Sequence, residues 1–272
     1  MRFAFVVSSG LGYQIPNLFQ NEESFLAFQE ALQALRRHGF TGVELNLHSD
    51  DQHLLARIRG SVNEAGLRLA ALGTGLLYAE DKLSFTDSDS AKREKAIRVV
   101  KRLLQFAAGD RAVAVIGLVR GVPNVQVGAN KLLREALIEC DRAAAECGGH
   151  IGLEAINRYE TPLLNTASDV VKLIEDERLT ATGLLLDTFH MNIEEASIEE
   201  TIRKYVSLIA HFHIADSNRW PPSHGHLKLD QHLRLLQELG YEGWVSAELL
   251  PKPDNATAVA ETAQFLRDHK FI

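Results

Sequence analysis

Three acidic residues and one histidine stand at the ends of four successive short apolar runs in the second half of the chain. The runs end in HIGLE, LLLD, HFH and VSAE, and their chemically active residues are Glu154, Asp187, His213 and Glu248. These residues are separated by 33, 26 and 35 positions, and each interval holds about one strand and one helix. Three carboxylates gathered at one place repel one another unless a cation compensates their charge. The spacing therefore predicts one divalent metal site built from four strand ends.

The identity of the metal and of its imidazole ligand leaves alternatives. Three carboxylates and one imidazole form a hard site that suits Mn²⁺, Mg²⁺ or Co²⁺ better than a structural zinc site does. His211 lies two residues before His213 on the same face of the strand and is an alternative ligand. We favour His213 because it is nearer the strand end, and we expect His211 to be packed or to support a ligand. Each of the four residues taken alone would equally suit a helix N-cap or a salt bridge at the rim of a sheet.

Short aliphatic runs alternate with longer amphipathic segments along the whole chain, and these are the elements that must position the four side chains. We expect strands over 2–7, 42–47, 68–73, 111–118, 150–155, 182–187, 208–214 and 243–249. Helices are expected near 23–37, 51–65, 89–107, 126–147, 166–176, 195–205, 229–239 and 255–268. Eight strand–helix units predict one α/β domain over residues 1–272, folded as a (β/α)8 TIM barrel with its site at the carboxyl ends of the strands. An open doubly wound sheet is the alternative, but no GxGxxG follows the first strand.

Composition restricts the partners and the compartment. The formal net charge of −7 argues against a broad basic surface for nucleic acid or for an anionic membrane. No apolar run approaches the ~20 residues that span a bilayer, so we expect a soluble, cytoplasmic protein. Cys140 and Cys147 lie on one predicted helix, roughly 10.5 Å apart and beyond the ~7 Å limit for a disulfide, which fits a reducing compartment.

Three segments of the second half resemble a known family. EAINRYETPLLNT, DTFHMNIEE and HFHIADSNRWPP are similar to the sugar epimerases of the xylose-isomerase-like barrel superfamily, and the D-tagatose 3-epimerase group is the nearest. In the first half, ALGTGLLYAEDKLSFTD and VIGLVRG are similar to the 5-keto-L-gluconate epimerases of that group. The resemblance covers nearly the whole chain. It implies that the protein is an isomerase and forms a homodimer or homotetramer. It also implies that the same four residues bind one divalent ion, with Mn²⁺ as the first candidate.

The resemblance also implies substrate contacts from Glu160, His190 and Arg219. Each has an ordinary alternative: Glu160 as a solvated loop acid, His190 as a helix cap, and Arg219 as the partner of a rim acid such as Asp216. The chain departs from the family where it reads GHLKLD, because Lys228 stands near the place of an expected acid. We therefore treat His224 and His226 as loop residues and not as ligands.

The chemistry expected of this site is proton abstraction beside a ketone. A metal that chelates the ketone oxygen and a neighbouring hydroxyl acidifies the C–H between them and stabilises the enediolate. Glu154 and Glu248, on strands five and eight, would flank that planar intermediate as the two catalytic groups of an epimerase acting at C3. A dehydratase of the inosose type begins with the same step and is an alternative. A nuclease on the same barrel is disfavoured by the acidic balance and by the single ligand set.

The substrate is expected to be a ketose or a keto-sugar acid. Arg120, at the exit of strand four, or Arg219 would hold a substrate carboxylate, which favours the interconversion of 5-keto-L-gluconate and D-tagaturonate. The alternatives are an Arg120 that only caps the rim and a 3-epimerase for neutral ketoses such as D-tagatose or D-psicose. Tyr13 and Trp220 could form an aromatic wall for a sugar or pack in the core. Small residues around Thr74 could leave room for a ligand.

Overall fold

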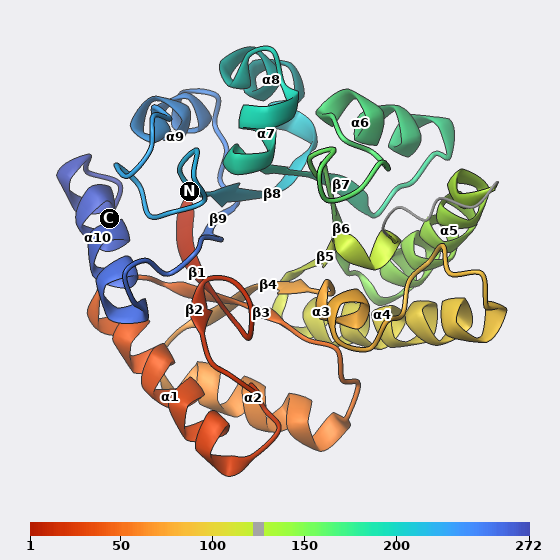
Figure 1. Ribbon diagram of the computed structural model, residues 1–272, viewed down its shortest axis with the longest axis horizontal. Coiled ribbons are helices and arrows are strands. Elements are labelled where there is room, and N and C mark those ends of the chain that lie inside the picture. Colours follow the sequence, from red (N-terminus) through yellow and green to blue (C-terminus); the bar gives the residue numbers. More distant parts are fainter. Residues whose placement is uncertain (122–127) are drawn as a thin grey trace.

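Eight parallel strands close into a barrel with helices around it, as the computed structural model of residues 1–121 and 128–272 shows (Figure 1). The barrel strands run in chain order, and β1 pairs with both β3 and β9, which closes the sheet. A further short strand, β2 (Tyr13–Gln14), lies beside β1. The barrel strands are β1 (Arg2–Ser8), β3 (Gly42–Asn46), β4 (Arg68–Gly73), β5 (Val113–Ile116), β6 (His150–Glu154), β7 (Thr182–Asp187), β8 (Ile209–Ile214) and β9 (Trp244–Ala247).

The helices bury one apolar face against the barrel. In α1, Phe25, Phe28, Leu32 and Leu35 follow the helical period and are buried, while the charged residues of the helix are exposed. Asn21 begins α1 with a side chain that accepts from the backbone N–H of Ser24. The helices are α1 (Glu22–Arg37), α2 (Gln52–Glu64), α3 (Leu76–Ala79), α4 (Ser90–Asp110), α5 (Ala129–Cys147), α6 (Ala167–Asp176), α7 (Thr188–Glu194), α8 (Ile198–Tyr205), α9 (Leu229–Glu238) and α10 (Asn255–Asp268).

The predicted fold class is confirmed, and the differences concern where elements begin and end. The strand expected over 111–118 is shorter, because β5 passes into a 3-10 turn at Leu118–Arg120. The helix expected from 195 is preceded by α7, which begins directly after Asp187. The start of the helix expected from 126 lies outside the described residues, and α5 begins at Ala129.

Two further sequence predictions concern the membrane and the cysteines. Within the described ranges, no helix combines the length and the apolar character needed to cross a bilayer. Cys140 and Cys147 are both free thiols on α5, and Cys140 is buried. The structure thus contains no bond between these two residues, as their spacing predicts.

Candidate metal centre

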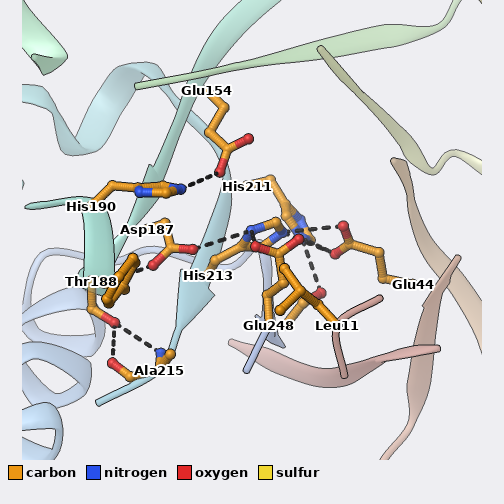
Figure 2. Close-up of polar contacts among 12 residues, drawn as sticks. Leu11, Glu44, Glu154, Asp187, Thr188, His190, His211, His213, Ala215 and Glu248 are labelled. Atoms are coloured by element: carbon orange, nitrogen blue, oxygen red, sulfur yellow. Dashed lines mark hydrogen bonds and ion pairs between the residues drawn. The ribbon is translucent and has the colours of Figure 1, made fainter. Parts of the chain in front are cut away.

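Glu154, Asp187, His213 and Glu248 converge at the carboxyl end of the barrel (Figure 2). Each offers one ligand atom, and the four atoms lie within 4.8 Å of one another. Glu154 and Asp187 end β6 and β7, His213 is the penultimate residue of β8, and Glu248 directly follows β9. Because adjacent parallel strands end at the same edge of the barrel, four strand ends in a row place their side chains around one point.

Asp187 and His213 each direct one unpartnered atom toward this point. Asp187 caps α7: its Oδ1 accepts from the backbone N–H of Phe189 at 2.7 Å, whereas its Oδ2 has no hydrogen-bond partner. The Nδ1 of His213 is also buried without a partner, 3.9 Å from Asp187 Oδ2 and 3.7 Å from Glu248 Oε2. Ligands bonded to one ion at about 2.1 Å are separated by roughly 3–4 Å. The donor set and its spacing therefore fit a divalent cation.

The pKa shifts of Glu154 and Glu248 also indicate that the site suits a cation. Burial raises the pKa of Glu248 to about 7, although His213 and Arg219 oppose this rise, and the neighbouring Glu154 and Asp187 add to it. Burial also acts to raise the pKa of Glu154, but the hydrogen bond and charge of His190 outweigh it and lower that pKa. The crowded carboxylates thus do not all stay charged by themselves, and a divalent ion would supply the missing positive charge.

His190 stands beside Glu154 in the pocket. It comes from the first turn of α7, is 2% exposed, and its Nε2 lies 3.4 Å from Glu154 Oε1. The amide of Asn157 donates to His190 Nδ1 at 2.7 Å and to Glu160 Oε1 at 2.9 Å. An accepting Nδ1 leaves the proton on Nε2, so His190 presents an N–H toward Glu154 and the pocket. Asn157 was not predicted as a site residue, although it lies inside the NRYET motif.

Arg219 joins the two sides of the pocket. Its guanidinium donates to Glu248 Oε2 at 2.9 Å and to Glu160 Oε1 at 3.1 Å, and it lies over the ring of Phe189 at 4.9 Å. The alternative pairing with Asp216 is wrong, because the Asp216 carboxylate accepts backbone N–H groups of its own loop instead. Arg219 and Glu160 therefore both line the cavity, and Arg219 contacts the candidate ligand Glu248.

Arg120 requires a correction, because it does not reach the pocket. Its side chain is fully buried, and its N–H groups donate to the backbone carbonyls of Gly117, Leu163, Ile116 and Glu154. Burial lowers the pKa of Arg120 to about 10, against the opposing charge of Glu154, so it stays charged at neutral pH. Four of its five N–H groups donate to these carbonyls, and Arg120 is not among the residues that line the cavity. The prediction that Arg120 holds a substrate carboxylate is therefore wrong.

Glu44 is a site residue that the sequence reasoning missed. It lies on β3, is 1% exposed, and accepts from Nε2 of His211 at 2.9 Å and from Nε2 of His213 at 3.1 Å (Figure 2). His211 is fully buried behind His213 and also contacts Ser246 Oγ at 2.9 Å. The signal in the sequence was a single acid in the otherwise apolar start of the run GVELNL. Glu44 lies inside β3 and in the first half of the chain, so the spacing of the last four strand ends does not point to it.

A cavity of about 180 Å³ opens over these residues. Residues from the loops after β1, β4 and β5 form its far side, including Leu11, Gly75 and Leu118. Thr74 also lines it, although its hydroxyl donates to the carbonyl of Val115 at 2.7 Å. Tyr13 instead lines a surface groove between α1 and α10 and forms no wall of this cavity. Trp220 is 37% exposed and packs near His224.

The two loop histidines lie apart from the four candidate ligands. His224 Nε2 contacts Glu261 Oε2 at 2.7 Å, and His226 Nδ1 contacts Ser217 Oγ at 2.9 Å. Neither belongs to a group of candidate ligands in the described part of the chain. This placement agrees with their treatment as loop residues.

The chain is similar to known proteins both in sequence and in fold. A family model described as "Xylose isomerase-like TIM barrel" matches residues 32–269. A D-psicose 3-epimerase of Enterocloster bolteae is 28% identical over 255 residues, which cover 89% of this chain and 83% of that protein. A 3-dehydro-D-guloside 4-epimerase of Escherichia coli is 30% identical over 141 residues, which cover 52% of this chain and 54% of that protein. A crystal structure of D-allulose 3-epimerase from Methylomonas sp. in complex with D-allulose has the same fold, with a TM-score of 0.80, 19% identity, and coverage of 99% of this chain and 97% of that one.

Proposed function

The chain belongs to the xylose isomerase-like TIM barrel family, and from this premise we propose that it is a sugar isomerase, a divalent-metal-dependent 3-epimerase of ketoses. The observation that carries the proposal is the pair of buried glutamates, Glu154 and Glu248, that belongs to one group of four candidate ligands. Relatives named D-psicose 3-epimerase, L-ribulose 3-epimerase and ketose 3-epimerase support this reaction class.

The donor set supports a hard cation, and we take Mn²⁺ as the first candidate, with Co²⁺ and Mg²⁺ as alternatives. Glu154, Asp187, His213 and Glu248 would hold it. An ion at that place would polarise the ketone of a bound sugar and make the neighbouring C–H acidic. Neutral His213 and three carboxylates would then carry a net charge that the ion and Arg219 together compensate.

The two glutamates are suited to opposite halves of an epimerisation. One carboxylate removes the proton from C3, and the other returns a proton to the opposite face of the planar enediolate. Each has a separate partner: His190 Nε2 lies 3.4 Å from Glu154, and Arg219 donates to Glu248 at 2.9 Å. The direction of the reaction decides which glutamate acts as base. Glu160 is bound to both Asn157 and Arg219 and holds these partners in place.

A neutral ketose suits the cavity better than a keto-sugar acid. Arg120, which would have held the carboxylate of 5-keto-L-gluconate, is enclosed by backbone carbonyls. Arg219 is the one arginine or lysine among the described residues that line the cavity, and it already contacts two glutamates. A second negative group from the substrate would add to an acidic site, so we place the sugar acid second.

The test uses Mn²⁺-loaded protein in D₂O with D-psicose, D-fructose, D-tagatose and 5-keto-L-gluconate, read by NMR. We expect deuterium at C3 and the 3-epimer for at least one neutral ketose. Exchange confined to 5-keto-L-gluconate would restore the sugar acid as substrate. An ultraviolet-absorbing enone product would indicate a dehydratase, and no exchange in any sugar would refute the epimerase.

The Glu154→Gln variant tests the roles of the glutamates. A glutamine keeps an oxygen that a cation can bind, but it cannot accept the proton from carbon. We expect C3 exchange to fall by at least 10³-fold while part of the metal affinity remains. Full exchange in Glu154→Gln would leave a metal site possible but would exclude this pair as the proton-transfer groups.

A further inference from the structure

The contact between Glu44 and the two histidines of β8 crosses the interior of the barrel. Glu44 lies on β3, whose neighbours in the sheet are β1 and β4, whereas His211 and His213 lie on β8 between β7 and β9. Figure 2 shows the Glu44 carboxylate directed at both imidazole rings. A carboxylate buried to 1% exposure is costly unless it is hydrogen-bonded, and here the two rings supply the donors.

The hydrogen bonds decide which nitrogen of each ring carries the proton. A carboxylate that lies between two imidazole rings accepts from both of them, because it has only acceptor atoms to offer when it is ionised. Nε2 of His213 lies 3.2 Å and 3.1 Å from the two oxygens of Glu44, so Nε2 is the donor. In a neutral imidazole the other nitrogen then holds a lone pair. That nitrogen, Nδ1, is the buried, unpartnered atom 3.9 Å from Asp187 Oδ2.

His211 and Ser246 keep Glu44 itself in position. His211 Nε2 lies 2.9 Å from Glu44 Oε2 and 2.9 Å from Ser246 Oγ, and its ring packs edge-on against the ring of His213 at 5.1 Å. Glu44, His211 and His213 thus form a buried network, of which Glu44 also borders the cavity. Its one outlet toward the candidate ligands is Nδ1 of His213.

We propose that Glu44 is a positioning residue that fixes His213 with its proton on Nε2 and its Nδ1 lone pair directed at the metal. The inference rests on the proposed metal site but not on the identity of the sugar. Carboxylates that accept from a ligating histidine orient the ring and increase its basicity, and their loss commonly lowers metal affinity by 10- to 100-fold. Glu44 touches neither the cation nor the substrate in this role.

Glu44, His211 and His213 could themselves surround an ion, and the geometry argues against that arrangement. The facing atoms of these three residues are already hydrogen-bonded to one another at 2.9 to 3.2 Å. At the other group, Asp187 Oδ2 and His213 Nδ1 have no partner, and Glu154 and Glu248 line the cavity. Glu44 also lines the cavity, but both of its oxygens are hydrogen-bonded to the histidine rings, so the unpartnered Asp187 Oδ2 and His213 Nδ1 favour the second group as the place of the ion.

The first experiment measures Mn²⁺ affinity by titration calorimetry on metal-free protein. Glu44→Gln keeps an accepting oxygen and should weaken binding by about 10-fold, whereas Glu44→Leu removes both hydrogen bonds and should weaken it by about 100-fold. Glu80→Gln is the control, because Glu80 accepts from Ser9 at 2.8 Å and does not belong to either group of candidate ligands. Unchanged affinity in folded Glu44→Gln and Glu44→Leu, confirmed by circular dichroism, would refute the positioning role and leave the epimerase standing.

The second experiment uses the wild-type chain and so does not depend on the folding of a variant. Nitrogen-15 NMR of the histidines, recorded with Zn²⁺ as a diamagnetic probe, reports which ring nitrogen is protonated and which binds metal. We expect the His213 Nδ1 resonance to move while Nε2 keeps its proton. Loss of the Nε2 protons of both His211 and His213 would place the ion against Glu44 and overturn the inference. No Zn²⁺ or Mn²⁺ binding at all would refute the metal site as well.

Discussion

The role of a single side chain in this barrel depends on which groups its polar atoms contact. Arg120 and Arg219 both follow barrel strands, yet Arg120 is enclosed by backbone carbonyls whereas Arg219 bridges Glu160 and Glu248. The difference lies in the 3-10 turn after β5, which folds Arg120 inward under Glu154. Arg120 therefore stabilises the fold, whereas Arg219, with the same side chain, lies in the candidate site.

At this scale we predict that Arg120→Ala costs stability and not substrate selectivity. The truncation leaves buried carbonyls without donors and should lower the free energy of unfolding by about 3 kcal/mol or more, measured by urea denaturation. Any loss of kcat/KM should be the same for D-psicose and for 5-keto-L-gluconate. A rise in KM confined to the sugar acid would show that Arg120 reaches the substrate after all.

A second prediction at the residue scale concerns protons. In the metal-free chain, burial raises the pKa of Glu248 to about 7, and the charges of Glu44 and Glu248 outweigh burial and raise the pKa of His213 to about 10. Both groups therefore hold protons below these values, and a cation must displace them. Mn²⁺ affinity should rise from pH 6 to pH 8 by up to about 10-fold per unit for each proton released. Calorimetry in two buffers of different ionisation enthalpy counts those protons, and a pH-independent affinity would contradict the assignment.

At the scale of elements, the end of β5 has to leave space for the end of β6. A Cβ on Gly117 would lie 2.7 Å from Glu154 Oε2, so the absence of a side chain there lets that carboxylate point into the cavity. The tie between β7 and β8 is a second example: the Thr188 hydroxyl donates to the carbonyl of Ala215 and accepts from its N–H. Such contacts fix the ends of neighbouring strands against each other.

Gly117→Ala should therefore damage the site more than the fold. We expect kcat/KM to fall on the order of 100-fold, because a displacement of about 1 Å in a reacting group is enough for such a loss. The melting temperature should change little, since the atom that must yield is the far end of a side chain. Gly75→Ala is the matched control, because Gly75 also lines the cavity but a Cβ there meets nothing within 4 Å. Equal activities of the two variants would show that Gly117 does not limit the position of Glu154.

At the scale of the whole molecule, the candidate ligands come from four consecutive strands, β6 to β9, and Glu44 adds β3 from across the barrel. A cation bound by these side chains would link the carboxyl ends of β6, β7, β8 and β9 to one another. The dimer or tetramer that the family resemblance implies stays a prediction, and light scattering of the purified protein would test it.

Metal removal should consequently lower the stability of the whole barrel. An ion that binds only the folded state at 100 times its dissociation constant adds about 2.7 kcal/mol, which corresponds to several degrees in melting temperature. We expect EDTA-treated protein to melt lower and Mn²⁺ to restore the difference, as measured by calorimetry. Asp187→Asn should lose this response to Mn²⁺. A full response in that variant would mean that the ion binds elsewhere.

The sequence alone determined the barrel and the four residues that converge at its mouth. This was possible because one strand and one helix separate Glu154, Asp187, His213 and Glu248 in turn, and parallel strands in chain order end at one edge. The direction of a long side chain has no such periodic rule, so only the tertiary structure showed that Arg120 turns inward. Glu44 meets His213 from 169 residues away across the barrel interior, a contact that exists only after the sheet closes. The local sequence pattern therefore predicts which residues stand at the strand ends. Which other side chains contact those residues depends on closure of the barrel.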